Sequence, residues 1–343
     1  RIQFRAMGNA EAPIAVHPAV IVHKHGGYGP NMAVIPLAKK LNGKMLIADI
    51  DFVGEVNGYP SEMMPLYKPG SAAAMDLKKD QKAILTIASM TALALSECHK
   101  AGFLHKDVKP ANILVYDAEK YACVLCDLGI ADPLKNGKAE CRQDRTPMYA
   151  APEVYDPDNT VNRDGYTWCL LTPAADYYSL GMSILSMWMG ESAFRAQQTE
   201  IELAIQKKKG SINIPSDMPD PLYTITKGLL VRNPEKRWGY AEIVKFLSGE
   251  TVEIEDDSDE IGQLNIVWSG SKNQVAHSLS DLAAFMREDP GLAKRYLYKG
   301  TLMEWLEDYP EMILALQDIT ETRYPKDQDR GLNAAMFVLD PDM

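Results

Sequence analysis

The sequence predicts an α+β fold in which a strand-rich first part precedes a helical body and an appended C-terminal α-helical module. Residues 1–67 contain β-branched apolar runs with glycine-rich punctuation, a pattern typical of strands. From Ala72 onward the apolar residues recur with helical spacing. An acidic run at 252–260 (VEIEDDSDE) is typical of a solvated linker and separates the last helical segment from the body.

Individual elements follow from local patterns. Strands are expected at Pro18–His23, Met45–Val56, Ile113–Val115 and Ala122–Leu125. Helices are expected at 31–41, at 72–101, between Pro173 and Leu247, and from Ser278 to Val338, with a polar loop before Pro173. Ser278 precedes Asp281 by three residues, so the last segment begins with a capping-box pattern.

Length and composition exclude several classes of protein. A chain of 343 residues is long enough for two or three domains, and 46% hydrophobic with 24% charged residues exclude a disordered or fibrous protein. The net charge of −11 argues against nucleic acid and anionic lipid as partners. Residues 251–343 carry 19 acidic and 8 basic residues, a net charge of −11, so residues 1–250 are neutral overall. This asymmetry indicates two functional parts.

Cysteine content and apolar stretches predict a cytoplasmic protein without a membrane segment. Five cysteines, an odd number, do not form a disulfide framework and fit a reducing compartment. The longest apolar stretches, Ile84–Leu95 and Tyr177–Gly190, are shorter than a bilayer span and are expected to be buried helices. The first residues show no secretory leader pattern.

The strongest chemical signal is a set of polar residues in three ordered motifs. Segment 105–114 (HKDVKPANIL) contains Asp107, Lys109 and Asn112, and Asp127 begins a DLG motif fifteen residues after Asn112. An APE motif follows at 151–153. The amide of Asn112 and the carboxylate of Asp127 offer the hard oxygen ligands that Mg²⁺ prefers when phosphates share its coordination. A lone Asp is more often a turn residue or helix cap, so the ordered set carries the signal.

In this order and at this spacing, the motifs resemble the catalytic loop, the metal-binding loop and the end of the activation segment of protein kinases. Two further segments, 176–181 (DYYSLG) and 233–237 (NPEKR), extend the resemblance. It implies a two-lobed protein-kinase-like fold with a divergent small lobe at 1–67 and a large lobe at 68–250. An acidic linker at 251–265 and the helical module at 266–343 would follow.

The resemblance also implies roles for these residues. Asp107 would take the proton of a substrate hydroxyl or orient that hydroxyl, and Lys109 would stabilise the transferring phosphoryl group. Asn112 and Asp127 would hold Mg²⁺ with ATP, the two implied cofactors. Gly129 is expected to let the backbone turn sharply after Asp127.

The small lobe matches the family pattern less closely. Gly8 stands where a glycine-rich phosphate loop is expected, and Lys24 is the best match to the strand lysine that holds the nucleotide phosphates. A solvated strand-end lysine is the alternative for Lys24, because no glutamate occurs between Glu11 and Glu55 to pair with it. Segment 59–67 resembles the strand and hinge that contact adenine, with Met64 as the gatekeeper candidate and Leu66 beside it.

Other residues of the motifs are expected to be structural. Asp176, His105 and the pair of Arg237 with Glu153 should support the fold rather than the chemistry. The Cys-x-x-Cys at 123–126 is expected to be strand core rather than a zinc or redox site. Lys106 stands where the family has an arginine that grips an activation-segment phosphate, and lysine is the poorer bidentate partner. Activation by phosphorylation of this segment is therefore not expected.

The resulting functional hypothesis is a serine/threonine protein kinase that acts on a protein substrate. The Asp-x-Lys-Pro-x-Asn pattern around Lys109 resembles serine/threonine rather than tyrosine kinases. Two alternatives remain open: a pseudokinase scaffold without efficient turnover, and a small-molecule phosphotransferase with a similar loop. The C-terminal module is a candidate site for a protein partner, with a passive stabilising appendage as the alternative.

Overall fold

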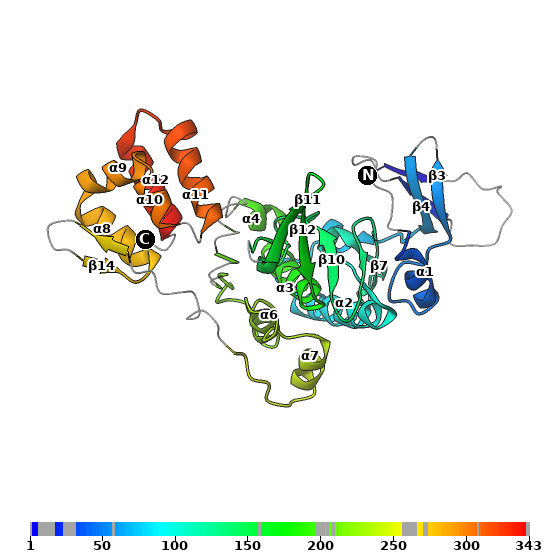
Figure 1. Ribbon diagram of the computed structural model, residues 1–343. Helices are drawn as coiled ribbons and strands as arrows, with labels where there is room; N and C mark the ends of the chain where they lie inside the picture. The colour runs from blue at the N-terminus through cyan, green and yellow to red at the C-terminus, as the bar shows by residue number, and fades with distance from the viewer. Residues whose placement is uncertain are drawn as a thin grey trace. The chain divides into compact units, whose positions relative to one another are not determined.

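The computed structural model describes residues 2–5, 18–22, 32–56, 59–156, 159–196, 203, 206–207, 210, 212–255, 266–269, 274–306 and 309–340. The chain divides into two compact units (Figure 1). The first comprises Arg1–Gln197 with Gly210–Asp257, and the second comprises Gln198–Lys209 with Ser258–Met343. No helix in the described part of the chain combines the length and apolar character needed to cross a membrane.

The first unit begins with a four-stranded antiparallel sheet in the order β1-β2-β4-β3. Its strands are β1 (Ile2–Arg5), β2 (Pro18–Val22), β3 (Phe52–Val56) and β4 (Tyr59–Pro65). A short helix, α1 (Ile35–Ala38), continues into the 3₁₀ turn η1 (Lys39–Leu41) before β3. The strand expected at Pro18–His23 is confirmed as β2 over Pro18–Val22, and His23 lies outside the described residues.

The strand expected at Met45–Val56 is present only in its second half. Residues 45–51 are irregular, because side chains bond to the backbone there: Asn42 Oδ1 accepts from Ile50 N at 3.3 Å, and Asp49 Oδ1 accepts from Gly43 N at 2.7 Å. Such local bonds compete with a strand ladder. A single parallel bridge joins Ile47 to Leu125 and connects this stretch to the body.

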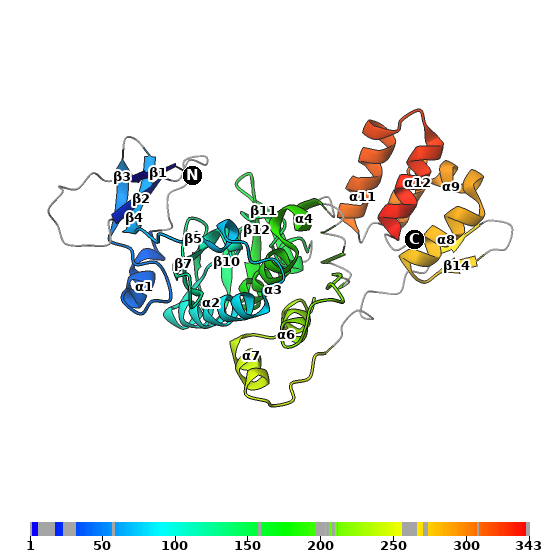
Figure 2. The same ribbon diagram turned by 180° about the vertical axis from the view of Figure 1, so that it is seen from behind.

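The helical body is built around two long buried helices, α2 (Gln81–Ala101) and α3 (Ala174–Met189), which lie side by side in both views (Figure 2). Helix α2 begins later than the expected residue 72, because Asp80 caps it by accepting from Ala83 N at 3.0 Å. Residues 72–74 form a separate 3₁₀ turn, η2 (Ala72–Ala74). Shorter helices complete the body: α4 (Glu191–Ala196), α6 (Leu222–Leu229) and α7 (Tyr240–Leu247).

Short strands of the body position the motif loops. Segment 105–112 lies between β6 (Phe103–Leu104) and β7 (Ile113–Asp117), and includes the 3₁₀ turn η3 (Pro110–Asn112). Asp127 follows β8 (Ala122–Leu125), which pairs with β7 in the sheet β5-β7-β8, where β5 is Gly70–Ser71. A second small ladder pairs β6 with β9 (Asp132–Pro133). Because β7 and β8 are neighbours, Asn112 and Asp127 come from adjacent strand ends.

The polar loop expected before Pro173 contains a three-stranded sheet instead. It is ordered β10-β12-β11, with β10 (Ala139–Arg142), β11 (Thr160–Arg163) and β12 (Tyr166–Leu171), and η4 (Pro152–Val154) lies between β10 and β11. Asp164 and Gly165 join β11 to β12, and both have positive φ, +55° and +75°. Positive φ at both central residues is the type I′ hairpin pattern, for which Asp-Gly is a preferred sequence.

The second unit has its own hydrophobic core. It begins with a hairpin of β13 (Ile266–Trp268) and β14 (Gln274–Ala276), which the expectation of an all-helical module missed. The helical segments follow: α8 (Leu279–Glu288), α9 (Pro290–Tyr298), α10 (Thr301–Trp305), α11 (Pro310–Gln317), the π-helical η7 (Asp318–Arg323) and α12 (Gln328–Leu339). The capping box of Ser278 and Asp281 is confirmed. Trp305 packs against Trp268 and Tyr296 in this core.

A buried ion pair joins the APE motif to the loop before α7. Arg237 donates from two nitrogens to the two carboxylate oxygens of Glu153, at 2.8 and 2.9 Å. The same guanidinium donates to the backbone carbonyls of Val231, Ala174 and Arg232. Its side chain is fully buried, so the Glu153 carboxylate neutralises a charge that water cannot reach.

We expect Glu153→Ala to lower the free energy of unfolding of the first unit by roughly 3–5 kcal/mol, because it leaves the Arg237 charge buried and unpaired. Glu140→Ala is the matched control, since Glu140 forms an ion pair with Arg163 in which both side chains are about half exposed. The control should change little. Urea unfolding of both variants measures the difference, and equal small effects would show that the buried pair does not stabilise the fold.

Candidate active site

One buried carboxylate holds the backbone of the catalytic loop (residues 105–112). Asp176, in the first turn of α3, accepts from His105 N at 2.9 Å and from Lys106 N at 2.8 Å. It also accepts from His99 Nε2, on α2, at 2.8 Å. Although burial alone opposes ionisation, hydrogen bonds from His99 and from the loop backbone keep the pKa of Asp176 below its usual range. The carboxylate therefore remains charged and anchors the loop between two helices.

His105 supports the loop as a neutral side chain. Its Nδ1 accepts from Asp107 N at 3.3 Å, so the proton resides on Nε2, which donates to the Cys126 carbonyl oxygen at 3.1 Å. Complete burial lowers the pKa of His105 and keeps the ring uncharged. The histidine thus links the catalytic loop to the residue before Asp127 and is not placed to exchange protons with a substrate.

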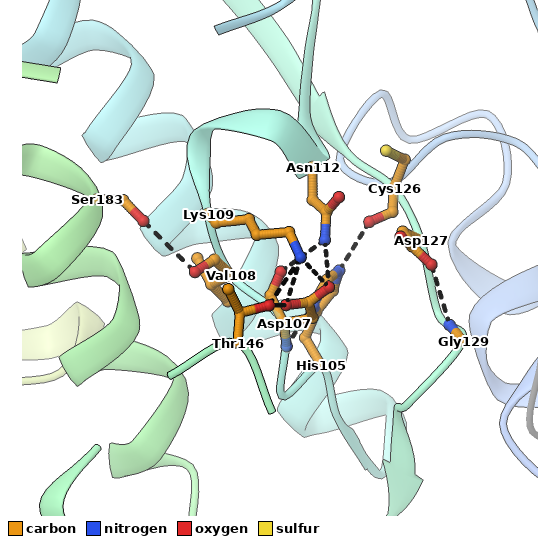
Figure 3. A network of polar contacts seen from close by, with 10 residues as sticks. All are labelled: His105, Asp107, Val108, Lys109, Asn112, Cys126, Asp127, Gly129, Thr146 and Ser183. Carbon is orange, nitrogen blue, oxygen red and sulfur yellow. Dashed lines mark hydrogen bonds and ion pairs between the residues drawn. The ribbon is translucent and has the colours of Figure 1, made fainter. Parts of the chain in front are cut away.

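Asp107 is the centre of a compact network (Figure 3). Lys109 Nζ lies 2.8 and 2.7 Å from its two carboxylate oxygens. Asn112 Nδ2 donates to Asp107 Oδ2 at 2.8 Å and to the Asp107 backbone oxygen at 2.8 Å. Thr146 Oγ1 donates to Asp107 Oδ1 at 2.6 Å and accepts from Lys109 Nζ at 2.8 Å. A carboxylate with this set of donors is fixed in position and in charge.

The electrostatics of Asp107 favour the ionised form. Its partial burial would raise the pKa, but the Lys109 ammonium and the hydrogen bonds from Lys109 and Thr146 outweigh burial and lower it. At neutral pH the group is a carboxylate that can accept a hydrogen bond from an incoming hydroxyl. The adjacent Lys109 ammonium can stabilise negative charge that develops near it.

Asn112 and Asp127 lie on neighbouring strand ends that are bonded to each other. Cys126 N donates to the Asn112 carbonyl oxygen at 2.9 Å, and Gly129 N donates to Asp127 Oδ1 at 3.3 Å. The backbone turns at Gly129 as expected, where Ala131 N donates to the Leu128 carbonyl oxygen at 3.2 Å, and Asp127 itself is also left-handed, with φ of +71°. The Asp127–Gly129 bond is an Asx-type turn, and it stabilises this left-handed residue.

Lys106 has a carboxylate partner of its own. Its backbone is also left-handed, with φ of +66°, and its side chain is almost fully buried. Nζ lies 2.8 Å from Asp132 Oδ2 and donates to the Arg142 carbonyl oxygen at 3.1 Å. Both partners belong to the activation segment (residues 127–153). Lys106 is thus paired within the protein, with partners that no sequence pattern predicted.

The structure describes part of the expected nucleotide site. Met64 is buried at the end of β4 and packs with Ala48, Val124 and Cys126, while Leu66 follows β4 directly and is partly buried. Gly8 and Lys24 lie outside the described residues. Of the predicted site residues, Asp107, Lys109 and Asn112 are in direct contact. Thr146 joins them through hydrogen bonds with Asp107 and Lys109.

Comparisons with known proteins agree with the motif pattern. A family model described as "Protein kinase domain" matches residues 59–246, more than half of the chain. A serine/threonine-protein kinase of Arabidopsis thaliana, AtPK1/AtPK6, is 32% identical over 146 residues, which cover 43% of this chain and 28% of that protein.

Two further relatives come from other branches. The serine/threonine-protein kinase SCH9 of Candida albicans is 30% identical over 177 residues, covering 51% of this chain and 21% of that protein. The human dual specificity mitogen-activated protein kinase kinase 7 is 29% identical over 178 residues, covering 50% of this chain and 40% of that protein. The chain thus spans well under half the length of these curated relatives.

The contact of Thr146 with Asp107 yields a test of the site's electrostatics. Thr146→Ala removes a donor to the ionised carboxylate, so it should raise the pKa of Asp107, because the charged form loses more stabilisation than the neutral form. Thr146→Ser keeps the hydroxyl and should leave that pKa close to wild type. A carbon-13 NMR titration of the Asp107 carboxyl measures both. An unchanged or lower pKa in Thr146→Ala would contradict the hydrogen bond.

Proposed function

The chain belongs to the protein kinase family, and from this premise we propose that it transfers the γ-phosphate of ATP to serine or threonine hydroxyls of a protein substrate. The observation that carries the proposal is the network in which Asp107, Lys109, Asn112 and Thr146 are joined. Phosphoryl transfer requires positioning and neutralisation of charge more than covalent help from the protein. The network supplies both.

Asp107 orients the substrate hydroxyl and receives its proton. The carboxylate is held by Asn112 on one oxygen and by Thr146 on the other, which limits its rotation. When the hydroxyl oxygen attacks the γ-phosphorus, the bond from that phosphorus to the β-phosphate oxygen breaks and ADP leaves, while the hydroxyl proton passes to Asp107, so no free alkoxide forms. Lys109, now paired with Asp107, is placed to shift toward the transferring group and offset its negative charge.

Asn112 and Asp127 fit a magnesium site that nucleotide phosphates complete. One contributes an amide oxygen and the other a carboxylate, both hard ligands, and they project from adjacent strand ends. Magnesium commonly takes one or two such protein ligands, with phosphates and water filling the rest of its octahedron. A magnesium ion held by Asn112 and Asp127 would supply positive charge that neutralises the phosphates. The protein's own part is the left-handed turn at Asp127, which directs that carboxylate.

The adenine side of the site is proposed at the end of β4. Met64 belongs to the apolar cluster that contains Ala48, Val124 and Cys126, and Leu66 follows directly after the last residue of β4. Gly8 and Lys24 remain the proposed phosphate contacts of the small lobe. Preference for serine and threonine is supported by the Lys109 pattern, and the similar proteins of Arabidopsis and Candida are named as serine/threonine kinases.

Contacts within the protein order the activation segment. β10 pairs with β12 through four residues of register, and the buried Lys106 is paired with Asp132 at the start of the segment. These contacts order the stretch that carries Thr146. We therefore propose that phosphorylation of the activation segment is not required for activity.

Asp107→Asn should lower kcat for transfer from Mg-ATP by about 10²–10⁴-fold while leaving nucleotide affinity nearly unchanged, because the carboxylate acts on the proton only during transfer. Asp164→Asn is the matched control: this exposed residue lies in the β11–β12 turn, and asparagine tolerates its left-handed backbone. Radiolabelled ATP, magnesium and a generic protein substrate provide the assay, and isothermal titration gives the nucleotide affinity.

The outcomes separate the candidate functions. Full activity in Asp107→Asn would refute the proposed role of this residue. Nucleotide binding by the wild-type chain without transfer to any protein would favour the pseudokinase scaffold. Transfer to a small alcohol, with none to protein, would favour the small-molecule phosphotransferase.

A further inference from the structure

Two cysteines face each other across the sheet that contains part of the activation segment. Cys141 lies in β10 and Cys169 in β12, and they are direct partners in the antiparallel register. Their Sγ atoms are 3.9 Å apart, and Cys141 Sγ is also 3.6 Å from the Cys169 carbonyl oxygen. Directly opposed residues in such a pair have Cα atoms about 4.5–5.5 Å apart, within the range that a disulfide spans. The backbone is therefore already positioned for a covalent link.

We propose that Cys141 and Cys169 form a redox-active dithiol that a hydroperoxide converts into a disulfide between β10 and β12. The proposal is independent of phosphoryl transfer, since it rests on the sheet and on the surroundings of the two sulfur atoms.

The surroundings distinguish the two thiols. Both thiols are buried, but Cys169 lines a small cavity together with the cations Lys106, Arg142 and Arg145 and the carboxylates of Asp144 and Asp176. The hydrogen bond from the Cys141 thiol lowers the pKa of Cys169, with Lys106 and Arg145 adding to the effect against the opposing influence of burial. The same bond, together with burial, raises the pKa of Cys141. Cys169 is therefore the nucleophile and Cys141 the resolving thiol.

Two other buried thiols, Cys98 and Cys123, have a different environment. Burial raises the pKa of Cys123 to about 12 and raises that of Cys98 as well, so both remain protonated. The chain thus offers an internal comparison between buried, inert thiols and the opposed pair.

The reaction balances with a hydroperoxide as the oxidant. The Cys169 thiolate attacks one oxygen of hydrogen peroxide, the O–O bond breaks, and hydroxide leaves to become water, which gives a sulfenic acid. The Cys141 sulfur then attacks the Cys169 sulfur as the S–O bond breaks. The departing hydroxide takes the Cys141 proton and leaves as a second water. Two electrons pass from the two sulfurs to the peroxide, and an S–S bond forms.

The disulfide would restrict the movement of the segment that leads to Thr146. Closing the sulfur separation from 3.9 Å to the bonded distance of about 2.05 Å ties β10 covalently to the β11–β12 hairpin. Arg142, the residue after Cys141, holds Lys106 Nζ through its carbonyl oxygen. The disulfide would thus fix the strand that supports the Lys106 side chain.

The test is peptide mapping of the full chain after brief treatment with hydrogen peroxide and alkylation of the remaining thiols. Trypsin cleaves after Lys138, Arg142, Arg163 and Arg195, so Cys141 and Cys169 fall in separate peptides, 139–142 and 164–195. We expect these two peptides to be recovered joined, lighter by two hydrogen atoms than their sum, and to separate on reduction with dithiothreitol. Cys123→Ser, the matched control, should form the same link.

Cys141→Ser tests the order of the two steps. Without the resolving thiol, Cys169 should stop at the sulfenic acid and be trapped by dimedone on peptide 164–195. The proposal is overturned if the wild-type peptides remain separate while both thiols are recovered alkylated or over-oxidised. It is equally overturned if either cysteine links preferentially to a different partner.

Discussion

The whole site depends on the buried carboxylate of Asp176. Three donors converge on it, one from α2 and two from the backbone of the catalytic loop, at 2.8 to 2.9 Å. One of these backbone donors is Lys106, whose left-handed conformation is unfavourable for a side-chain-bearing residue. The charge-assisted bonds offset that cost. They also explain why an ionised group lies in the first turn of a helix that is otherwise apolar.

From Asp176 and the loop that it anchors, hydrogen bonds extend through the site in two directions. Toward the proposed magnesium ligands, His105 bonds to the Cys126 carbonyl, and Cys126 N bonds to the Asn112 carbonyl, so two separate loops share one hydrogen-bonded frame. In the other direction, Lys106 bonds to Asp132 in β9 and to Arg142 at the end of β10, which ties both strands to the loop of residues 105–112. Asp107 is thereby placed between rigid partners rather than on a loop that must order at each turnover.

Much of this site could be predicted from sequence because its parts are local. Asp107, Lys109 and Asn112 occur within six residues, and their contacts follow once that segment is a tight loop. The partners of Lys106 could not be predicted in this way, since Asp132 and Arg142 lie far along the chain and no pattern marks them. The β11–β12 hairpin was missed although its Asp-Gly turn was visible, because its exposed strands carry little apolar alternation.

The predicted boundaries of two other elements were wrong because polar side chains bond to the backbone there. Side-chain bonds of Asn42 and Asp49 to the backbone displaced half of an expected strand, and the Asp80 cap set the start of α2. The spacing of apolar residues in the sequence gives no information about such polar bonds. It did locate α3 and the helices of the second unit, whose positions depend on burial of apolar side chains.

The most direct test of this account is amide hydrogen exchange at His105 and Lys106 in the full chain, with Asp176→Asn for comparison. If the Asp176 carboxylate anchors the catalytic loop, both amides should exchange only as fast as the first unit unfolds globally. In Asp176→Asn at least one of them should lose that protection, because one asparagine oxygen cannot replace both carboxylate oxygens. Rapid exchange of both amides in the wild-type chain would contradict the central role given to Asp176.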